Sequence, residues 1–495
     1  IGMKHNKNLI ELPGYELSKV IHEKEASCVE VMQAYLDHIE KVNPKVNAIV
    51  SLQDRDALME QAKAKDAQLA EGKDNGWMHG FPQAIKDLSA TKGILTTKGS
   101  LAFQNFIPDK DSLMVSRMKE AGSIIIGKTN TPEFGYGSQS YNLVFGTTGN
   151  AYDPSKTSGG SSGGAACSLA LRMQAVADGS DYMGSLRNPA GWQNIYSLRP
   201  SLGCVANPNE DAFSGTQSTV GPMGRTVADI ALLLNTQAGY HYTAPLSKQK
   251  DPRIAELTPY NVHEKLKKDI KGMKIGWLGD WNGYLAMEDG ILETTEKAVF
   301  GLEQYGVKVE RIQPFYDPEK FWKKVWLPIR HYSACSKHSL MEKETRNLTK
   351  PESQWEYDGS KTISVQDVYD AFVNRTSFYL AMMKLYEEEG FDLLAVPSAQ
   401  VFPFDKSIHW PKEIAGRKMQ TYHNWMEVTT YWTMGGNAIA TCPAGFGGKE
   451  HMPIGIQFAG KPGSDFDVLC FAKAYEDIYD FAERYRPSML DDSNN

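Results

Sequence analysis

The chain has 495 residues, 41% of them hydrophobic and 23% charged, a composition that excludes a disordered or fibrous protein. Its 53 basic and 60 acidic residues give a net charge of −7, which argues against a nucleic-acid or anionic-membrane partner. The chain has no run of roughly 18 uninterrupted apolar residues and starts with polar residues 1–9, so we expect neither a membrane-spanning helix nor a signal peptide.

The cysteines are scattered along the chain without a Cys-x-x-Cys pair. This usage predicts reduced thiols in a cytoplasmic protein and no zinc or other metal site. The positions are Cys28, Cys167, Cys204, Cys335, Cys442 and Cys470.

The N-terminal region, residues 1–75, is predicted to be helical. Ser27 and Glu30 form a capping box, and apolar residues follow at helical spacing until Pro44 ends the helix. A second helix is expected over about residues 54–71.

Farther along the chain, short apolar runs alternate with helical stretches. We predict strands at residues 124–126, 174–177, 274–278, 307–312, 393–396, 438–441 and 454–458. Helices are predicted at 114–121, 165–172, 227–234, 291–304 and 468–479. The alternation predicts an α/β fold, in which helices cover both faces of a central, largely parallel or mixed β-sheet within a single domain, 1–495. Residues 315–435 lack clean alternation, and we expect a mostly helical inserted region there.

A segment rich in glycine and serine, Thr-Ser-Gly-Gly-Ser-Ser-Gly-Gly-Ala, occupies residues 157–165. A flexible linker is disfavoured because an apolar helix and strand follow at once. A phosphate-binding loop is disfavoured because neither GK[ST] nor GxGxxG is present. Glycines permit tight turns and adjacent serines can relay protons, so the segment favours a catalytic role.

Two further segments carry candidate chemistry. In residues 179–187, Ser185 follows a small residue at a predicted strand-to-helix turn, which suits a nucleophile near free backbone N–H groups. No histidine is near in sequence, so a Ser-His-Asp triad has no support. Lys86 follows an apolar pair after a Gly/Pro turn. Most lysines are solvated surface charges, but one held in an apolar site can be neutral and act as a base.

Together, Gly80–Asp87, Gly159–Gly164 and Gly179–Arg187 resemble the motifs of the amidase signature family of serine hydrolases. The resemblance continues through residues 127–134, 198–201, 221–226, 442–446 and 453–457. It implies the family fold, with 80–230 as the signature core and 315–435 as the variable region for substrate specificity.

Residue by residue, the resemblance implies that Ser185 is the nucleophile and Lys86 the base. Ser161 matches the serine that follows a cis peptide bond and relays the proton between them. Ser162 matches a supporting hydroxyl. Asp181 and Arg187 match a structural ion pair. The implied oxyanion hole consists of the backbone N–H groups of Tyr182, Met183, Gly184 and Ser185.

Two departures from the family pattern are visible, and one is Ser197 before Leu-Arg-Pro, where many members have glycine. Where many members have Gly-Gly-Ser, this chain has Met183-Gly184-Ser185. The backbone donors survive this change, but Met183 adds bulk and cannot adopt dihedral angles reserved for glycine.

The implied activity is hydrolysis of carbon–nitrogen bonds in linear, non-peptide amides through an acyl-enzyme, without a metal or an organic cofactor. Residues 401–434 hold a run of aromatic side chains, which fits either core packing or an apolar substrate wall. We therefore expect a neutral apolar or aromatic amide substrate, with Trp425 and Trp432 as candidate contacts. The sequence does not decide whether esters, carbamates or amide oligomers are also substrates.

Two alternatives remain: a glutamine-amidase subunit of a multichain amidotransferase, and a non-catalytic binding protein on the same fold. As a partner we expect a small-molecule amide substrate, and neither a nucleic acid nor a membrane. The sequence leaves open whether the protein forms a homodimer.

Overall fold

The computed structural model describes residues 8–492. The polar start that predicts no signal peptide therefore lies almost entirely outside the described residues. Within them, no helix is both long enough and apolar enough to cross a membrane.

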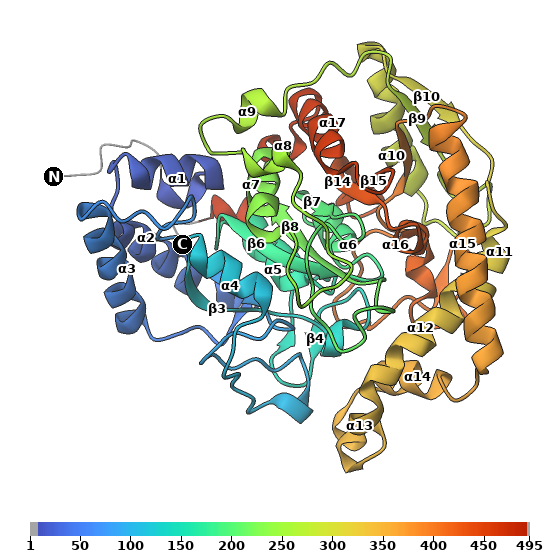
Figure 1. The fold of residues 1–495 in the computed structure, drawn as a ribbon, viewed down its shortest axis with the longest axis horizontal. Coiled ribbons are helices and arrows are strands. Elements are labelled where there is room, and N and C mark those ends of the chain that lie inside the picture. The colour runs from blue at the N-terminus through green and yellow to red at the C-terminus, as the bar shows by residue number, and fades with distance from the viewer. Residues whose placement is uncertain (1–7, 493–495) are drawn as a thin grey trace.

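The core of residues 8–492 is a mixed sheet of eight strands in the order β10-β9-β11-β15-β14-β7-β8-β6, flanked by helices (Figure 1). This confirms the predicted α/β class. In the described chain, β9 pairs in parallel with β10 and β11, and the other neighbours are antiparallel. The strands are β6 (Val176–Asp181), β7 (Tyr196–Arg199), β8 (Thr219–Gly224), β9 (Lys274–Trp277), β10 (Lys308–Arg311), β11 (Leu393–Pro397), β14 (Ala438–Gly447) and β15 (Met452–Gly460).

A second sheet has the order β1-β3-β2, with β1 at Ile49–Val50, β2 at Pro82–Lys86 and β3 at Ile124–Thr129. Its strand β2 runs beside β6 of the central sheet. The junction of the two sheets therefore brings Lys86, the last residue of β2, next to the C-terminal half of β6. Two small hairpins complete the strands: β4 (Tyr141–Asn142) with β5 (Gly146–Thr147), and β12 (Glu413–Ile414) with β13 (Arg417–Lys418).

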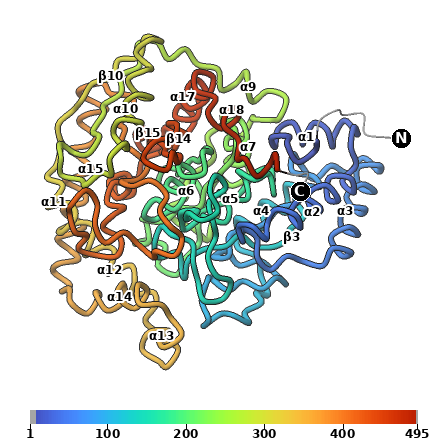
Figure 2. Tube along the Cα trace, turned by 180° about the vertical axis from the view of Figure 1, so that it is seen from behind, coloured from blue at the N-terminus to red at the C-terminus, as the bar shows by residue number. Residues whose placement is uncertain are grey.

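Helices at the N-terminal end form a layer at one side of the molecule: α1 (Gly14–His22), α2 (Cys28–Val42) and α3 (Arg55–Ala70). The predicted capping box is present, because Ser27 and Glu30 satisfy each other's backbone N–H groups at the start of α2. The C-terminal end returns to the same side of the molecule (Figure 2). There Arg486 forms an ion pair with Glu11 at 2.9 Å.

Helices that pack on the sheets include α4 (Leu113–Glu120), α5 (Gly163–Ala170), α6 (Arg187–Trp192), α7 (Val227–Gln237), α10 (Ile291–Gly301) and α17 (Asp465–Ile478). Short helices are α8 (Pro252–Ala255), α9 (Val262–Lys265) and α18 (Phe481–Arg484). The strand predicted at 174–177 is displaced: β6 begins at Val176 and extends to Asp181.

Residues 315–435 contain α11 (Pro318–Phe321), α12 (Leu327–Ser333), α13 (His338–Met341), α14 (Pro351–Gly359), α15 (Val365–Glu387) and α16 (Thr430–Gly435). The same range also contributes β11, which lies between β9 and β15 of the central sheet. Its largest helical stretch therefore ends with α15, the chain then enters the sheet as β11, and α16 follows before β14.

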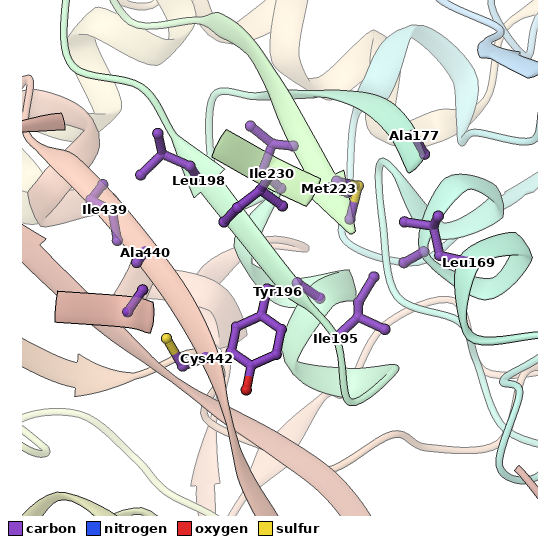
Figure 3. Packing of buried hydrophobic residues seen from close by; sticks show 14 of the residues in the cluster. Leu169, Ala177, Ile195, Tyr196, Leu198, Met223, Ile230, Ile439, Ala440 and Cys442 are labelled. Carbon is purple, nitrogen blue, oxygen red and sulfur yellow. The ribbon is translucent and has the colours of Figure 1, made fainter. Parts of the chain in front are cut away.

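The hydrophobic core lies around β7 and β14 (Figure 3). Tyr196 and Leu198 share one face of β7, where Leu198 pairs with Ala440 of β14, and Met223 of β8 pairs with Ser197 on the other face. These strands are covered on both faces, so every residue of β7 is buried even though Ser197 and Arg199 alternate with its apolar residues. The cysteines all lie in the described part of the chain and are free thiols, as predicted.

Candidate active site

Lys86 is buried at the junction of the two sheets, with 1% of its surface exposed. Its Nζ atom lies 2.6 Å from Ser161 Oγ, 2.8 Å from Ser162 Oγ and 2.8 Å from Ser180 Oγ. A neutral amine has two N–H donors and one lone pair, so three hydroxyl neighbours can satisfy it completely. The arrangement suits an uncharged lysine.

Burial lowers the pKa of Lys86 to about 7, against the opposing charges of Asp178 and Asp181. Asp178 is itself buried, and its carboxylate accepts the backbone N–H of Lys86 at 3.3 Å. A lysine with this pKa holds a substantial fraction of neutral amine at neutral pH and can accept a proton.

The glycine-serine segment turns tightly into α5, and its Gly160–Ser161 peptide bond is cis. A Cβ atom on Gly164 would lie 2.3 Å from the backbone nitrogen of Asn130 and 2.6 Å from the carbonyl oxygen of Ala48. Glycine is therefore required for this close approach of two backbones. The packing fixes the segment that presents Ser161 to Lys86.

Ser185 lies in the loop between the end of β6 at Asp181 and the start of α6 at Arg187, with 6% of its surface exposed. Gly184 has a φ of 87°, and a Cβ atom there would lie 2.6 Å from Thr429 Cγ2. The position that needs glycine is thus Gly184.

Met183, which departs from the family pattern, has an ordinary negative φ. It adds bulk to the wall of a small cavity beside Ser185 and requires no dihedral angle reserved for glycine. The loop accommodates the substitution without backbone strain.

Asp181 organises this loop through an ion pair with Arg187 at 2.8 Å and one with Arg199 at 3.0 Å. It also accepts the backbone N–H groups of Gly184 and Leu186 at 3.1 and 3.0 Å. Burial opposes ionisation of Asp181, but the two guanidinium groups hold its pKa well below the ordinary value.

The backbone N–H groups implied for the oxyanion hole differ in their partners. Gly184 N–H is engaged by Asp181. For Met183 and Ser185, no hydrogen bond of the backbone N–H occurs within residues 8–492. The same holds for the Tyr182 N–H, so three of the four predicted donors have no hydrogen-bond partner within the described residues. The ring of Tyr182 lines the larger cavity.

A cavity of about 240 Å³ lies over the serines. It is lined by Leu88, Phe134, Gly135, Tyr136, Ser161, Ser180, Tyr182, Ser185, Ser218, Arg330, Ser333, Ala334, Ser336 and Lys337. Across the described chain, no hydrogen bond joins the Ser161 and Ser185 hydroxyls, although both line this cavity. Catalytic hydrogen bonds are often long before substrate binds.

The aromatic run 401–434 divides between the site and the core. Trp425 is 1% exposed and lines the small cavity beside Ser185, with its ring stacked on Trp192. Trp432 lines neither cavity; it is buried against Phe315 and Tyr431.

His423 also lines the small cavity, but both of its ring nitrogens are engaged. Its Nε2 accepts the Trp326 indole N–H at 3.3 Å, and its Nδ1 lies 2.6 Å from Thr421 Oγ1. This histidine is thus not free to act as the base for Ser185. The described residues contain no cluster of His, Cys, Asp and Glu that could hold a metal ion.

A family model described as Amidase matches residues 30–469 of the chain. The chain belongs to the amidase signature family. It is 31% identical to the A subunit of the glutamyl-tRNA(Gln) amidotransferase of Carboxydothermus hydrogenoformans, over 97% of this chain and 100% of that protein.

Solved structures of other amidase signature proteins resemble this amidase. A bacterial aryl acylamidase superposes with a TM-score of 0.86 at 27% identity, covering 95% of this chain and 97% of that one. The A subunit of the glutamyl-tRNA(Gln) amidotransferase of Thermotoga maritima superposes with a TM-score of 0.74 at 26% identity, covering 96% of each chain.

Sequence reasoning missed two neighbours of Lys86 in this amidase, Asp178 and Ser180. Both lie on β6, two residues apart, so their side chains point to the same face of the strand. Residues 176–181, Val-Ala-Asp-Gly-Ser-Asp, have no apolar alternation, so the sequence offered no signal that the strand predicted at 174–177 continues to Asp181. No local sequence pattern identified Arg199 or Arg330 as a residue of the site.

We expect the kcat/KM of amide hydrolysis to fall as pH drops through about 7, because Lys86 becomes protonated and loses its lone pair. Replacing Asp178 with Asn removes a negative charge that favours the ammonium form of Lys86. The fall in kcat/KM should therefore occur at a lower pH in this variant. Profiles measured with a chromogenic anilide would check both effects. A maximum near pH 5 would contradict the role of Lys86.

The Asp181→Asn variant should lose roughly 3–5 kcal/mol of unfolding free energy, because two buried guanidinium groups lose their charged partner. Asp37→Asn, which breaks an exposed pair with Arg55, should cost less than about 1 kcal/mol. Urea unfolding of both variants measures the difference. Equal losses would show that Asp181 does not have the stabilising role assigned to it.

Proposed function

We propose that this protein hydrolyses linear carboxylic amides through an acyl-enzyme on Ser185. The observation that carries the proposal is the buried Lys86 amine, 2.6 Å from Ser161 Oγ, in the wall of the cavity that contains Ser185. An amide is a weak electrophile with a poor leaving group, so its hydrolysis needs an activated nucleophile and a proton for the leaving nitrogen.

In the proposed reaction, Ser185 Oγ attacks the carbonyl carbon and its proton passes to Ser161, which gives its own proton to Lys86. The negative oxygen of the tetrahedral intermediate is held by the N–H groups of Met183 and Ser185. The proton then returns through Ser161 to the leaving amine as the carbon–nitrogen bond breaks. Water, activated through the same serine and lysine, hydrolyses the ester and releases the carboxylic acid.

Rings around the serines support an aryl or apolar group on the substrate. Phe134, Tyr136 and Tyr182 line the larger cavity, and Trp425 lines the smaller one. Within the described residues, neither lining set includes an aspartate or glutamate. The ammonium of a free amino-acid amide would therefore be buried without a partner. Similarity to the aryl acylamidase also supports neutral aryl or alkyl amides.

A second candidate is the glutamine-amidase subunit of a multichain amidotransferase. The identity of 31% to an amidotransferase A subunit, over nearly the full length of both chains, supports this candidate more directly than it supports an aryl substrate. It requires partner chains, whereas a stand-alone hydrolase does not. Glutaminase activity that appears only with such partners would separate the two.

Ser185→Ala should abolish anilide hydrolysis and labelling by a fluorophosphonate, because the nucleophilic oxygen is gone. Ser218→Ala is the matched control: Ser218 lines the same cavity and has no hydrogen bond to Lys86 within residues 8–492. Intact mass and peptide mapping should find one adduct, on Ser185. An adduct on Ser161, or full activity of Ser185→Ala, rejects the assignment.

Kinetics on a panel of amides should give a higher kcat/KM for neutral aryl or medium-chain amides than for glutamine or asparagine. Trp425→Phe should change the ranking among acyl groups, because its ring lines the cavity. Trp432→Phe should keep the parent's ranking, because Trp432 lies in the core. The proposal of a neutral substrate fails if glutamine is the best substrate of the isolated chain.

A further inference from the structure

One face of a continuous helical segment forms a wall of the larger cavity. The segment consists of α12 and the 3-10 turn η7 (Ala334–Lys337) that continues it. Arg330, Ser333, Ala334 and Lys337 all line the cavity together with the catalytic serines. Their spacing of three, four and seven residues places them on one side of a helix. Two basic residues therefore project from this face toward the reacting amide.

Arg330 is a fixed cation, 5% exposed, that lines both the larger and the smaller cavity. Its Nε–H donates to Glu356 at 2.8 Å, and the Tyr422 hydroxyl also interacts with the guanidinium. The ring of Tyr182 stacks on it at 4.5 Å. Most of its five N–H groups therefore have no described hydrogen-bond partner and remain for a ligand.

Lys337 is half-buried at the same cavity, with its Nζ atom 5.2 Å from the centre of the Phe134 ring. Its single described hydrogen bond is long, 3.5 Å to Ser336 Oγ. Burial, together with the charges of Lys98 and Arg330, lowers the pKa of Lys337 to about 8, and Asp211 and Glu210 oppose this shift. The charge of Arg330 is paired with the buried Glu356 carboxylate at 2.8 Å, so within the described residues Lys337 is the cavity cation without a carboxylate partner in an ion pair.

We propose that this cavity selects amides that carry a carboxylate at the end remote from the scissile bond, held by Lys337 and Arg330. A carboxylate is planar and accepts two hydrogen bonds, which matches the free edge of a guanidinium. The inference rests on the proposed hydrolysis at Ser185, and it changes the neutral substrate proposed there to one that is apolar near the scissile bond and carries a carboxylate at its remote end. The electrostatics order the substrates by charge: carboxylate-bearing amides first, neutral amides second, and ammonium-bearing amides last.

The test uses two series of anilides, one with the charge on the acyl chain and one with it on the aryl ring. In each, a carboxylate is compared with a neutral methyl ketone of the same length. Wild-type kcat/KM should favour the carboxylate by roughly ten-fold or more in at least one series, the ratio that one charge-assisted hydrogen bond supplies. This preference should fall as ionic strength rises.

Lys337→Gln should lower the kcat/KM of the carboxylate compound roughly ten-fold more than that of the neutral compound, and Lys337→Arg should restore the preference. Lys343→Gln is the matched control, because it removes the same charge from an exposed position nearby that does not line the cavity. A loss that is equal for charged and neutral compounds would mean that Lys337 has only a structural role, and this result overturns the proposal.

Binding separates this inference from the proposed chemistry. Titration calorimetry of the Ser185→Ala variant with both series needs no turnover, and the carboxylate compounds should again bind about ten-fold tighter. Equal binding of charged and neutral compounds in both series overturns the inference, whatever the wild-type enzyme hydrolyses. Failure of the wild-type enzyme to hydrolyse any anilide would instead reject the proposed function.

Discussion

The site depends on one constraint, the exclusion of water from the Lys86 amine. The central sheet and the smaller sheet meet around this side chain, and three serine hydroxyls replace its hydration. Burial in such surroundings favours the neutral amine, because an ammonium without full solvation or a paired charge is costly. An opening that admitted water would return the lysine to its ordinary pKa and remove the base at neutral pH.

The negative charges near Lys86 are arranged so that this neutrality survives. Asp178 and Asp181 are anions near Lys86, and the oxygens of Asp181 are bound by Arg187, Arg199 and the backbone of the nucleophile loop. Arg187 also donates to the Thr429 carbonyl and to Gln457 of β15, at 2.8 and 2.7 Å. The loop that carries Ser185 is therefore fixed by groups from distant parts of the chain. The position of the nucleophile therefore depends on contacts that the C-terminal half makes with this loop.

Local sequence patterns predicted much of the fold and the residues at the centre of the site. The capping box at Ser27 and the apolar run at residues 393–396 are local features, and each gave the expected helix start or strand. The order of β9, β11 and β15 could not be deduced, because strand pairing is decided by contacts far apart in sequence. Trp425 and Trp432 share one aromatic run, and only tertiary packing separates the cavity wall from the core. Residues 327–337 likewise resemble any amphipathic helix until the cavity beside them is known.

The position of β11 limits how the substrate wall can change between related proteins. This strand follows α15 directly in the chain and lies between β9 and β15. Residues 318–387 contribute no strand to the sheet. This helical stretch can therefore be replaced as a unit without changing the pairing of the strands. An exchange that extended past residue 393 would interrupt the backbone pairing of the core. Divergence of substrate preference is therefore expected to concentrate in the helices before β11, where sequence drift leaves the buried lysine and its serines untouched.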